Sequence, residues 1–425
     1  MMLKLNRWCI GISLILAIVF PTVFILPKLI LLVGVVACTT HALLSREIPI
    51  SLRWALAAVL YSAMGLSASL YGVMVGAPGA LRVLTVMAIY PILFTIIAFT
   101  YEYADTRRLS KIFVISAWLL IVVDLAYIIS NLLFPHNSYA IFLEELYLEG
   151  AVIDNADSYY KFTVPNLSSI LFLLPFFFFS IIASRKKNKL NAILIFAFLF
   201  GISILSGRRA IIVCFVFGSF LAYIISGNLH KFNLPRWKRK TIFYIFILAL
   251  IYYILNKYEL LDFYLTQIES TFNFEENASN KERSLQFDEL VDGIISAPFF
   301  GNGAGAAAGY LRSDTQTWTY ELSYVALAFQ YGMIGFIIYF FGIVFLINGM
   351  KKIVKKNTDE GFSLCYLAGF LSFLIANATN PYLGKYDYMW LIFIPVAMLI
   401  SLKKIERNKK CTLYDILSKN KRNYS

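Results

Sequence analysis

The chain has few charged side chains and even fewer residues of the types that bind metals. Charged residues make up 15% of its 425 residues, with only three histidines and five cysteines. The histidines, His41, His136 and His230, are far apart in the sequence, so we expect no metal site and no cofactor. Cysteine is missing from the predicted outer loops, which excludes disulfides there.

Apolar residues dominate instead. Hydrophobic residues make up 59% of the chain and aromatic residues 16%, and the mean hydropathy is +0.70. Runs of roughly 17 to 25 apolar residues can cross a bilayer as helices. The sequence therefore predicts an all-α polytopic membrane protein with a single transmembrane domain, 1–425. The twelve predicted spans are 8–26, 29–44, 54–72, 83–101, 112–133, 166–184, 190–205, 210–227, 241–256, 321–347, 361–379 and 389–402.

The basic residues predict the orientation. If the N-terminus lies in the cytoplasm, only ten of the 38 lysines and arginines fall in outer segments, which leaves 28 inside. Basic residues are enriched in cytoplasmic loops, so both termini are expected to be cytoplasmic. The net charge of +13 is then a topology signal, and nucleic-acid binding is not needed to explain it. Basic inner loops also favour anionic membrane lipids as partners.

Two outer segments are long enough to fold: 134–165, and 257–320 between the ninth and tenth spans. In the second, Ser279 and Glu282 have capping-box spacing, and apolar residues then recur with a helical period up to Pro298. This pattern predicts an amphipathic helix near the membrane surface, with Arg283 in its first turn. Gly301–Gly305 is expected to follow as a flexible hinge.

Arg208 and Arg209 stand between two apolar runs, on the predicted outer side. Cations there oppose the positive-inside bias, and the dipole at a helix start disfavours them. A bound anion such as pyrophosphate reverses that balance, because helix-start N–H groups and guanidinium groups then face it together. The alternative is that the arginines anchor the helix by reaching the lipid headgroups.

Other polar residues are weaker candidates. Arg283 and Arg312 are predicted to converge on the same anion, and Arg82, at the outer start of the fourth span, is an additional candidate. Asp124 lies inside the fifth span, where a carboxylate is costly and needs a partner that the sequence does not identify.

Two parts of the sequence resemble a known superfamily, the O-antigen polymerases and O-antigen ligases. The first is Ser206-Gly-Arg-Arg-Ala210 between two spans. The second joins Arg283 to Pro298-Phe-Phe-Gly301-Asn-Gly303, Glu321-Leu-Ser-Tyr324 and Gln330-Tyr-Gly332-Met-Ile-Gly335. The resemblance is strongest over residues 200–336.

The resemblance implies a membrane-embedded, metal-independent, inverting glycosyltransferase of GT-C-like architecture. It would lie in the bacterial inner membrane with its active site facing the periplasm, so the outer loops would be periplasmic. Donor and acceptor would be glycans on undecaprenyl pyrophosphate, and a chain-length regulator protein is an implied partner. Arg208 or Arg209, together with Arg283, would hold the pyrophosphate.

Ligases of this group have a catalytic histidine eleven residues before the glycine matched by Gly332, and this chain has Glu321 there. That difference favours a repeat-unit polymerase. A glutamate at the outer mouth of a span can act as the base that activates the acceptor hydroxyl. Tyr320 and Tyr324 are candidates for positioning the sugar. The alternative reading is that Glu321 only stabilises the helix start, where acidic residues are favoured.

Two other functions remain open at this stage. One is the ligase, which uses the same donor with a lipid A core acceptor. The other is a non-enzymatic flippase for lipid-linked oligosaccharides, which would also have about twelve spans. Flippases often show two-fold internal repeats, whereas the one large outer loop of this chain is placed asymmetrically.

The orientation can be tested by cysteine labelling. Cysteines introduced singly at Ser313 and Ser138 should react with a membrane-impermeant thiol reagent added to sealed cells, because both positions are predicted to be outside. Asn188→Cys should react only after the membrane is permeabilised. Labelling of Asn188→Cys in sealed cells would overturn the predicted orientation.

Overall fold

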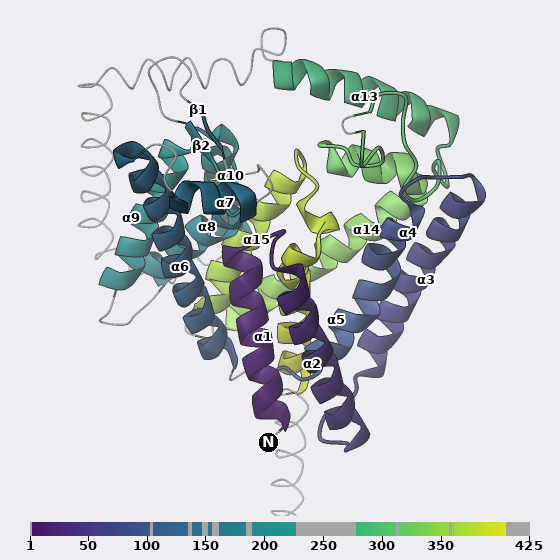
Figure 1. Cartoon of the computed structure of the whole chain (residues 1–425). Helices are drawn as coiled ribbons and strands as arrows, with labels where there is room; N and C mark the ends of the chain where they lie inside the picture. The colour runs from purple at the N-terminus through teal and green to yellow at the C-terminus, as the bar shows by residue number, and fades with distance from the viewer. Residues whose placement is uncertain are drawn as a thin grey trace, which may run out of the picture.

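The structure is a computed structural model, and it is almost entirely helical (Figure 1). It describes residues 2–102, 105–134, 138–146, 152–154, 161–183, 189–226, 278–311, 314–356, 359 and 361–404. Within these ranges the only strands are β1 (Val152–Asp154) and β2 (Lys161–Thr163), which form a short antiparallel pair.

The described residues up to Ser226 form ten helices and one π-helical turn. In order they are α1 (Met2–Val19), α2 (Ile25–Leu44), α3 (Leu52–Met74), α4 (Ala80–Leu84), the π turn η1 (Thr85–Ile89), α5 (Tyr90–Ala98), α6 (Thr106–Leu133), α7 (Ser138–Leu146), α8 (Leu167–Ala183), α9 (Leu190–Leu205) and α10 (Arg209–Ser226). The later helices are α13 (Ala278–Ser296), α14 (Ser323–Lys356), α15 (Phe362–Asn377), the 3-10 turns η4 (Tyr382–Gly384) and η5 (Tyr386–Tyr388), and an apolar helix within Tyr386–Lys404.

Eleven of the twelve predicted spans coincide with apolar helices, and the ninth, 241–256, lies outside the described residues. Seven of these helices are long and apolar enough to cross a membrane, and four are shorter. Large apolar side chains such as Ile25, Ile30 and Val33 on α2 are exposed. Such a surface is unfavourable in water and favourable in lipid hydrocarbon. The prediction of a helical membrane protein is therefore confirmed.

The centre of the molecule is an aromatic core. Phe113 of α6 and Phe172 of α8 have ring centroids 5.3 Å apart, and both rings contact Trp390 of the last helix. Tyr366 of α15 packs edge-on against Phe172 at 5.0 Å. Dispersion contacts between these closely packed rings hold the four helices together.

Two contacts between buried polar side chains join segments that are far apart in the sequence. Asn166, just before α8, donates a 2.6 Å hydrogen bond to Asp124, and both side chains are fully buried. This contact supplies the partner that the sequence did not identify. Lys28 of α2 forms a 2.5 Å ion pair with Asp387, which also accepts a 2.9 Å hydrogen bond from the Thr22 backbone N–H. The turn between α1 and α2 is thereby held to the start of the last helix.

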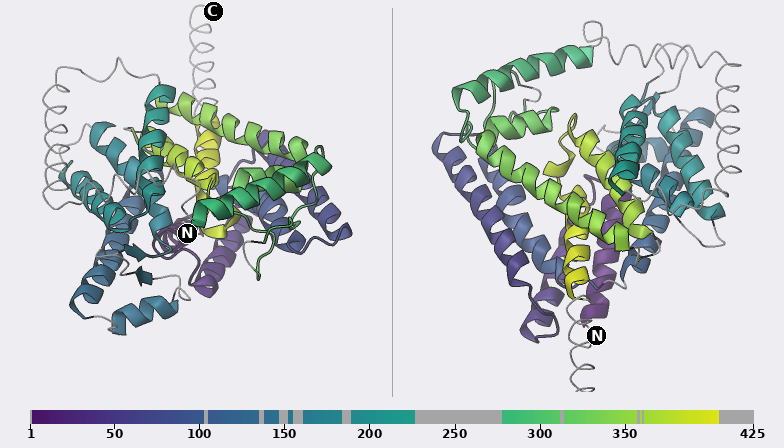
Figure 2. Two further views of the ribbon diagram at one scale, coloured as in Figure 1. Left: turned by 90° about the horizontal axis from the view of Figure 1, so that it is seen from above. Right: turned by 180° about the vertical axis from the view of Figure 1, so that it is seen from behind.

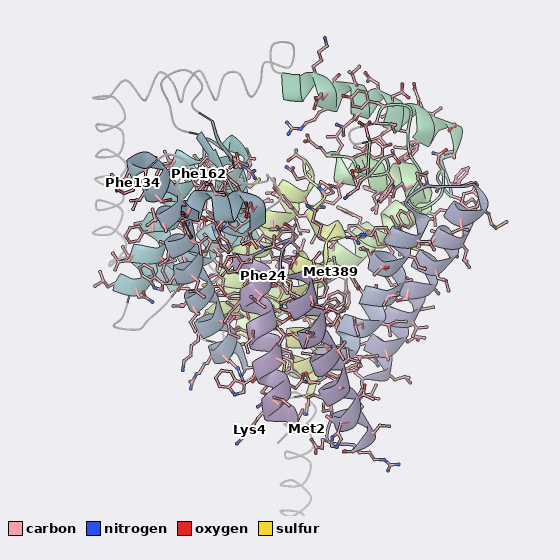
Figure 3. All side chains as sticks on the ribbon, in the orientation of Figure 1. Met2, Lys4, Phe24, Phe134, Phe162 and Met389 are labelled. Carbon is pink, nitrogen blue, oxygen red and sulfur yellow. The ribbon has the colours of Figure 1, made fainter. Side chains whose placement is uncertain are left out.

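Figure 3 places Met2 and Lys4 at one end of the helices, which we call the basic end. The opposite end, which we call the loop end, carries the segment with Phe134 and Phe162, and it also carries α13 (Figures 1 and 3). Figure 2 shows α13 and the first part of α14 lying across the loop end, seen from above and from behind. Phe24 and Met389 lie at a similar level between these two ends (Figure 3).

The glycine-rich segment after α13 is a packed loop, and the expectation of a flexible hinge is wrong. The Asn302 N–H donates to the Phe329 carbonyl at 2.9 Å, and the Ala304 N–H donates to the Ala68 carbonyl at 3.2 Å. Gly301, Gly303 and Gly305 all have positive φ, a conformation that glycine adopts without strain. The segment therefore joins α3 to α14 through its own backbone.

α14 bends at Gly332, where φ is +66° inside an otherwise helical run. A Cβ atom at this position would lie 2.2 Å from the Phe299 carbonyl oxygen. The Met333 N–H donates to the Pro298 carbonyl at 2.8 Å, which replaces a bond lost at the bend. The two motif segments that begin at Pro298 and Gln330 are therefore in direct contact.

One boundary was predicted incorrectly. The helix expected after Ser279 already includes Ala278, where the described residues resume, so Arg283 does not lie in its first turn. Of the apolar residues that suggested an amphipathic helix, Leu290 is buried whereas Leu285 and Ile295 are exposed.

The bend in α14 gives a stability prediction. Gly332→Ala should lower the free energy of unfolding by about 2 kcal/mol or more, because it adds both left-handed strain and a clash with Phe299. Gly342→Ala, in the same helix with no atom within 4 Å of its Cβ position, is the matched control and should not destabilise. Thermal unfolding in detergent measures both. Equal melting temperatures for the two variants would contradict the assignment.

Candidate functional site

An ion pair joins α13, at the loop end, to the start of α14. Arg283 Nε lies 2.7 Å from Glu321 Oε2, and the two side chains are 31% and 14% exposed. Both residues were predicted from sequence as site residues, and the structure brings them into direct contact. A partly buried, charge-assisted pair of this length holds both groups in defined positions.

Gln286 holds the same glutamate from a second direction. It is three residues after Arg283, so both side chains lie on one face of α13. Its Oε1 accepts a 3.0 Å hydrogen bond from the Glu321 backbone N–H, and its side chain is fully buried. Within the part of the chain that the structure describes, its Nε2 has no hydrogen-bond partner. Gln286 therefore keeps a buried amide donor close to the ion pair.

Arg208 lies in a tight turn between α9 and α10. Gly207 has φ of +61°, which permits the reversal, and the Arg208 N–H faces the Ser206 hydroxyl at 3.3 Å. The Arg208 side chain is half-buried. Arg209 is the first residue of α10, but its side chain lies outside the described part of the structure.

Tyr382 connects these two parts. It follows α15, which packs against α10, and its ring lies 5.3 Å from Phe373 and 5.5 Å from Tyr388. Burial raises the pKa of Tyr382, while the nearby Arg208 cation lowers it and Glu321 raises it. One phenol thus lies within electrostatic range of both Arg208 and Glu321. Tyr382 thus relates the segment of Arg208 to the Arg283–Glu321 pair, and the binding of one anion by both arginines stays a prediction.

The other predicted site residues fall elsewhere. Arg312 lies outside the described residues. Arg82 is exposed on α4, which lies on the side of the molecule opposite α10 in Figure 1. The Tyr320 hydroxyl accepts a hydrogen bond from the Ala308 N–H, and Tyr324 donates to the Leu374 carbonyl at 2.8 Å. Because both hydroxyls bond to the backbone, we do not assign them to a sugar.

The arrangement suits an anion beside a base. Arg208 and Arg283 supply two guanidinium groups, each able to form a fork of hydrogen bonds to a phosphate. Glu321 supplies a carboxylate, and Tyr382 and Gln286 supply neutral donors. Within the described residues there is no group of three or more metal-ligating side chains.

Sequence reasoning missed Gln286 and Tyr382. A signal for Gln286 was present, since it follows Arg283 by three residues in a predicted helix. No comparable signal existed for Tyr382, because its position depends on how α15 packs against α10.

Comparisons with protein-family models, curated proteins and solved structures gave no match.

A double-mutant cycle tests whether the Arg283–Glu321 pair is formed. Arg283→Gln, Glu321→Gln and the double variant should show a coupling of about 1 kcal/mol in thermal stability, as expected for a partly buried pair. The Arg7–Glu102 pair at the basic end, 28% and 54% exposed, is the control and should give less than about 0.5 kcal/mol. Coupling no larger than that of the control would contradict the contact.

Proposed function

We propose that this chain is a membrane glycosyltransferase that joins lipid-linked oligosaccharide repeat units into a surface polysaccharide. The observation that carries this proposal is the Arg283–Glu321 pair close to Arg208 and Tyr382. A cationic site suits a pyrophosphate, and a carboxylate beside it suits activation of a hydroxyl. Donor and acceptor are then both glycans on undecaprenyl pyrophosphate, as the resemblance to O-antigen polymerases implies.

The reaction is a direct displacement at the anomeric carbon of the donor sugar. The acceptor hydroxyl oxygen forms the new glycosidic bond as the bond between the anomeric carbon and the pyrophosphate oxygen breaks. Glu321 takes the hydroxyl proton, and the lipid pyrophosphate leaves with the bonding electron pair. Attack from the opposite face inverts the anomeric configuration. Arg208 and Arg283 stabilise the charge that develops on the leaving group.

Because of the ion pair, donor binding precedes proton transfer to Glu321 in the proposed reaction. While Arg283 is bound to Glu321, the guanidinium holds a carboxylate oxygen that would otherwise be open to the acceptor hydroxyl. A pyrophosphate carries more negative charge than a carboxylate and competes for Arg283. Arrival of the donor then frees Glu321 to accept a proton, so the base is activated only when a donor is present.

The glycan of a deletion strain tests the proposed function. Without this chain, the surface glycan should be reduced to single repeat units, and wild-type protein should restore the long-chain ladder. Glu321→Gln should not restore it, because the amide keeps the shape and loses the basicity, whereas Glu321→His should restore short ladders. Complete loss of attached glycan would indicate a ligase, and cytoplasmic accumulation of the lipid-linked repeat would indicate a flippase. A normal ladder with Glu321→Gln would exclude Glu321 as the base.

The donor site is tested at Arg208. Arg208→Ala should cut polymer formation by about 100-fold, the loss expected when one stabilising donor is removed from a developing charge. Arg208→Lys should rescue poorly, since a point charge does not reproduce the guanidinium fork. Arg53→Ala, at the start of α3 near the basic end, is the control and should retain activity. Membrane abundance of each variant is measured alongside, and full activity of Arg208→Ala would rule out this role.

A further inference from the structure

A cavity lies away from the Arg283–Glu321 pair, between α1, α2, α5, α6 and the helix within Tyr386–Lys404. Its volume is about 140 Å³. Most of its lining is apolar, with Leu14, Val35, Ile97, Ile112, Trp390 and Phe393 among the residues that form it. Along α1 it extends from Arg7 to Ala17. At a rise of 1.5 Å per residue this is about 15 Å, close to the hydrocarbon depth of one leaflet.

The cavity has charged side chains only towards the basic end. Arg7 and Arg108 line it together with Asp105. Arg7 Nη2 lies 2.9 Å from Glu102 and its Nε lies 3.5 Å from Asp105, which fixes the direction of the guanidinium group. Arg108 lies over the Trp8 ring at 5.2 Å.

The surroundings of this end are positive. Arg7 and the segment 102–111 together contribute four basic and two acidic side chains: Arg7, Arg107, Arg108 and Lys111 against Glu102 and Asp105. An apolar slot that ends in a net positive rim matches a molecule with a hydrocarbon chain and an anionic head. Basic pockets between transmembrane helices bind anionic lipid headgroups in this way.

We propose that this cavity is a binding site for an anionic phospholipid from the leaflet at the basic end. One acyl chain lies along α1 and against Trp390, and the phosphate lies between Arg7 and Arg108. The guanidinium of Arg7 has five N–H donors, more than its two carboxylate contacts use. The bound chain would fill the space between α1, α6 and the last helix and hold these helices together.

The position of the charged end distinguishes this lipid from a lipid-linked substrate. In the proposed reaction, the pyrophosphate lies at the loop end with Arg208 and Arg283. A substrate bound there has no anionic group left for Arg7 and Arg108 at the opposite end. The lipid site therefore stands independently of the proposed function.

Fluorescence quenching by brominated lipids tests the site, because Trp390 lines the cavity. The quenching of Trp390 is obtained as the difference in fluorescence quenching between the wild type and Trp390→Phe, both measured in mixed micelles. Phosphatidylglycerol with brominated acyl chains should reach half-maximal quenching at a mole fraction about fivefold lower than brominated phosphatidylcholine. Arg7→Gln and Arg108→Gln should each reduce this preference, while Arg53→Gln, an arginine that does not line the cavity, should keep it.

A cavity-filling variant tests the acyl-chain part separately. Ala98 is buried and lines the cavity, and Ala98→Phe should abolish Trp390 quenching by either lipid. Ala397→Phe fills the cavity from the last helix, and it replaces Ala98→Phe in this test if Ala98→Phe does not fold. Equal quenching by the two lipids, or an unchanged preference in Arg7→Gln and Arg108→Gln, would overturn the proposal. Stronger displacement of the brominated lipid by a long-chain polyprenyl phosphate than by phosphatidylglycerol would also overturn it.

Discussion

The Arg283–Glu321 ion pair fixes the two charged groups of the candidate site at the loop end of this molecule. It is one of the contacts between α13, a helix with many exposed polar residues, and the start of the apolar helix α14, beside the apolar cluster that contains Leu290 and Phe329. Gln286 reinforces it through the backbone of the same glutamate. Because a charge-assisted pair constrains direction as well as distance, the carboxylate and the guanidinium face one site.

The position of Glu321 depends on a backbone contact further along the chain. Gly332 bends α14 where Phe299 and Gly301 approach it, and the loop from Pro298 to Ala306 fills the space between α3 and α14. Glycine is needed on both sides of this contact, since a Cβ atom on either would overlap backbone atoms. The packed loop thus fixes the direction in which the first part of α14 runs.

Much of the fold was predictable because membrane helices are marked by long apolar runs, and eleven predicted spans coincide with helices. The partners of buried polar residues were not predictable. Asp124 meets Asn166 and Lys28 meets Asp387 across 42 and 359 residues of sequence, respectively. Arg283 and Glu321 were both predicted as site residues, but their direct contact was not predicted. The place of Tyr382 was not predicted either, because it depends on the packing of α15 against α10. The glycine-rich loop was misjudged because glycine permits both flexible hinges and close backbone packing.

Competition for Arg283 is the central claim, and the affinity for a polyprenyl pyrophosphate tests it most directly. The dissociation constant should be measured for purified wild-type protein and for Glu321→Gln. If Glu321 and the pyrophosphate compete for Arg283, removing the carboxylate's charge should tighten binding by about fivefold, which corresponds to about 1 kcal/mol from a partly buried ion pair. Unchanged or weaker binding by Glu321→Gln would contradict the account.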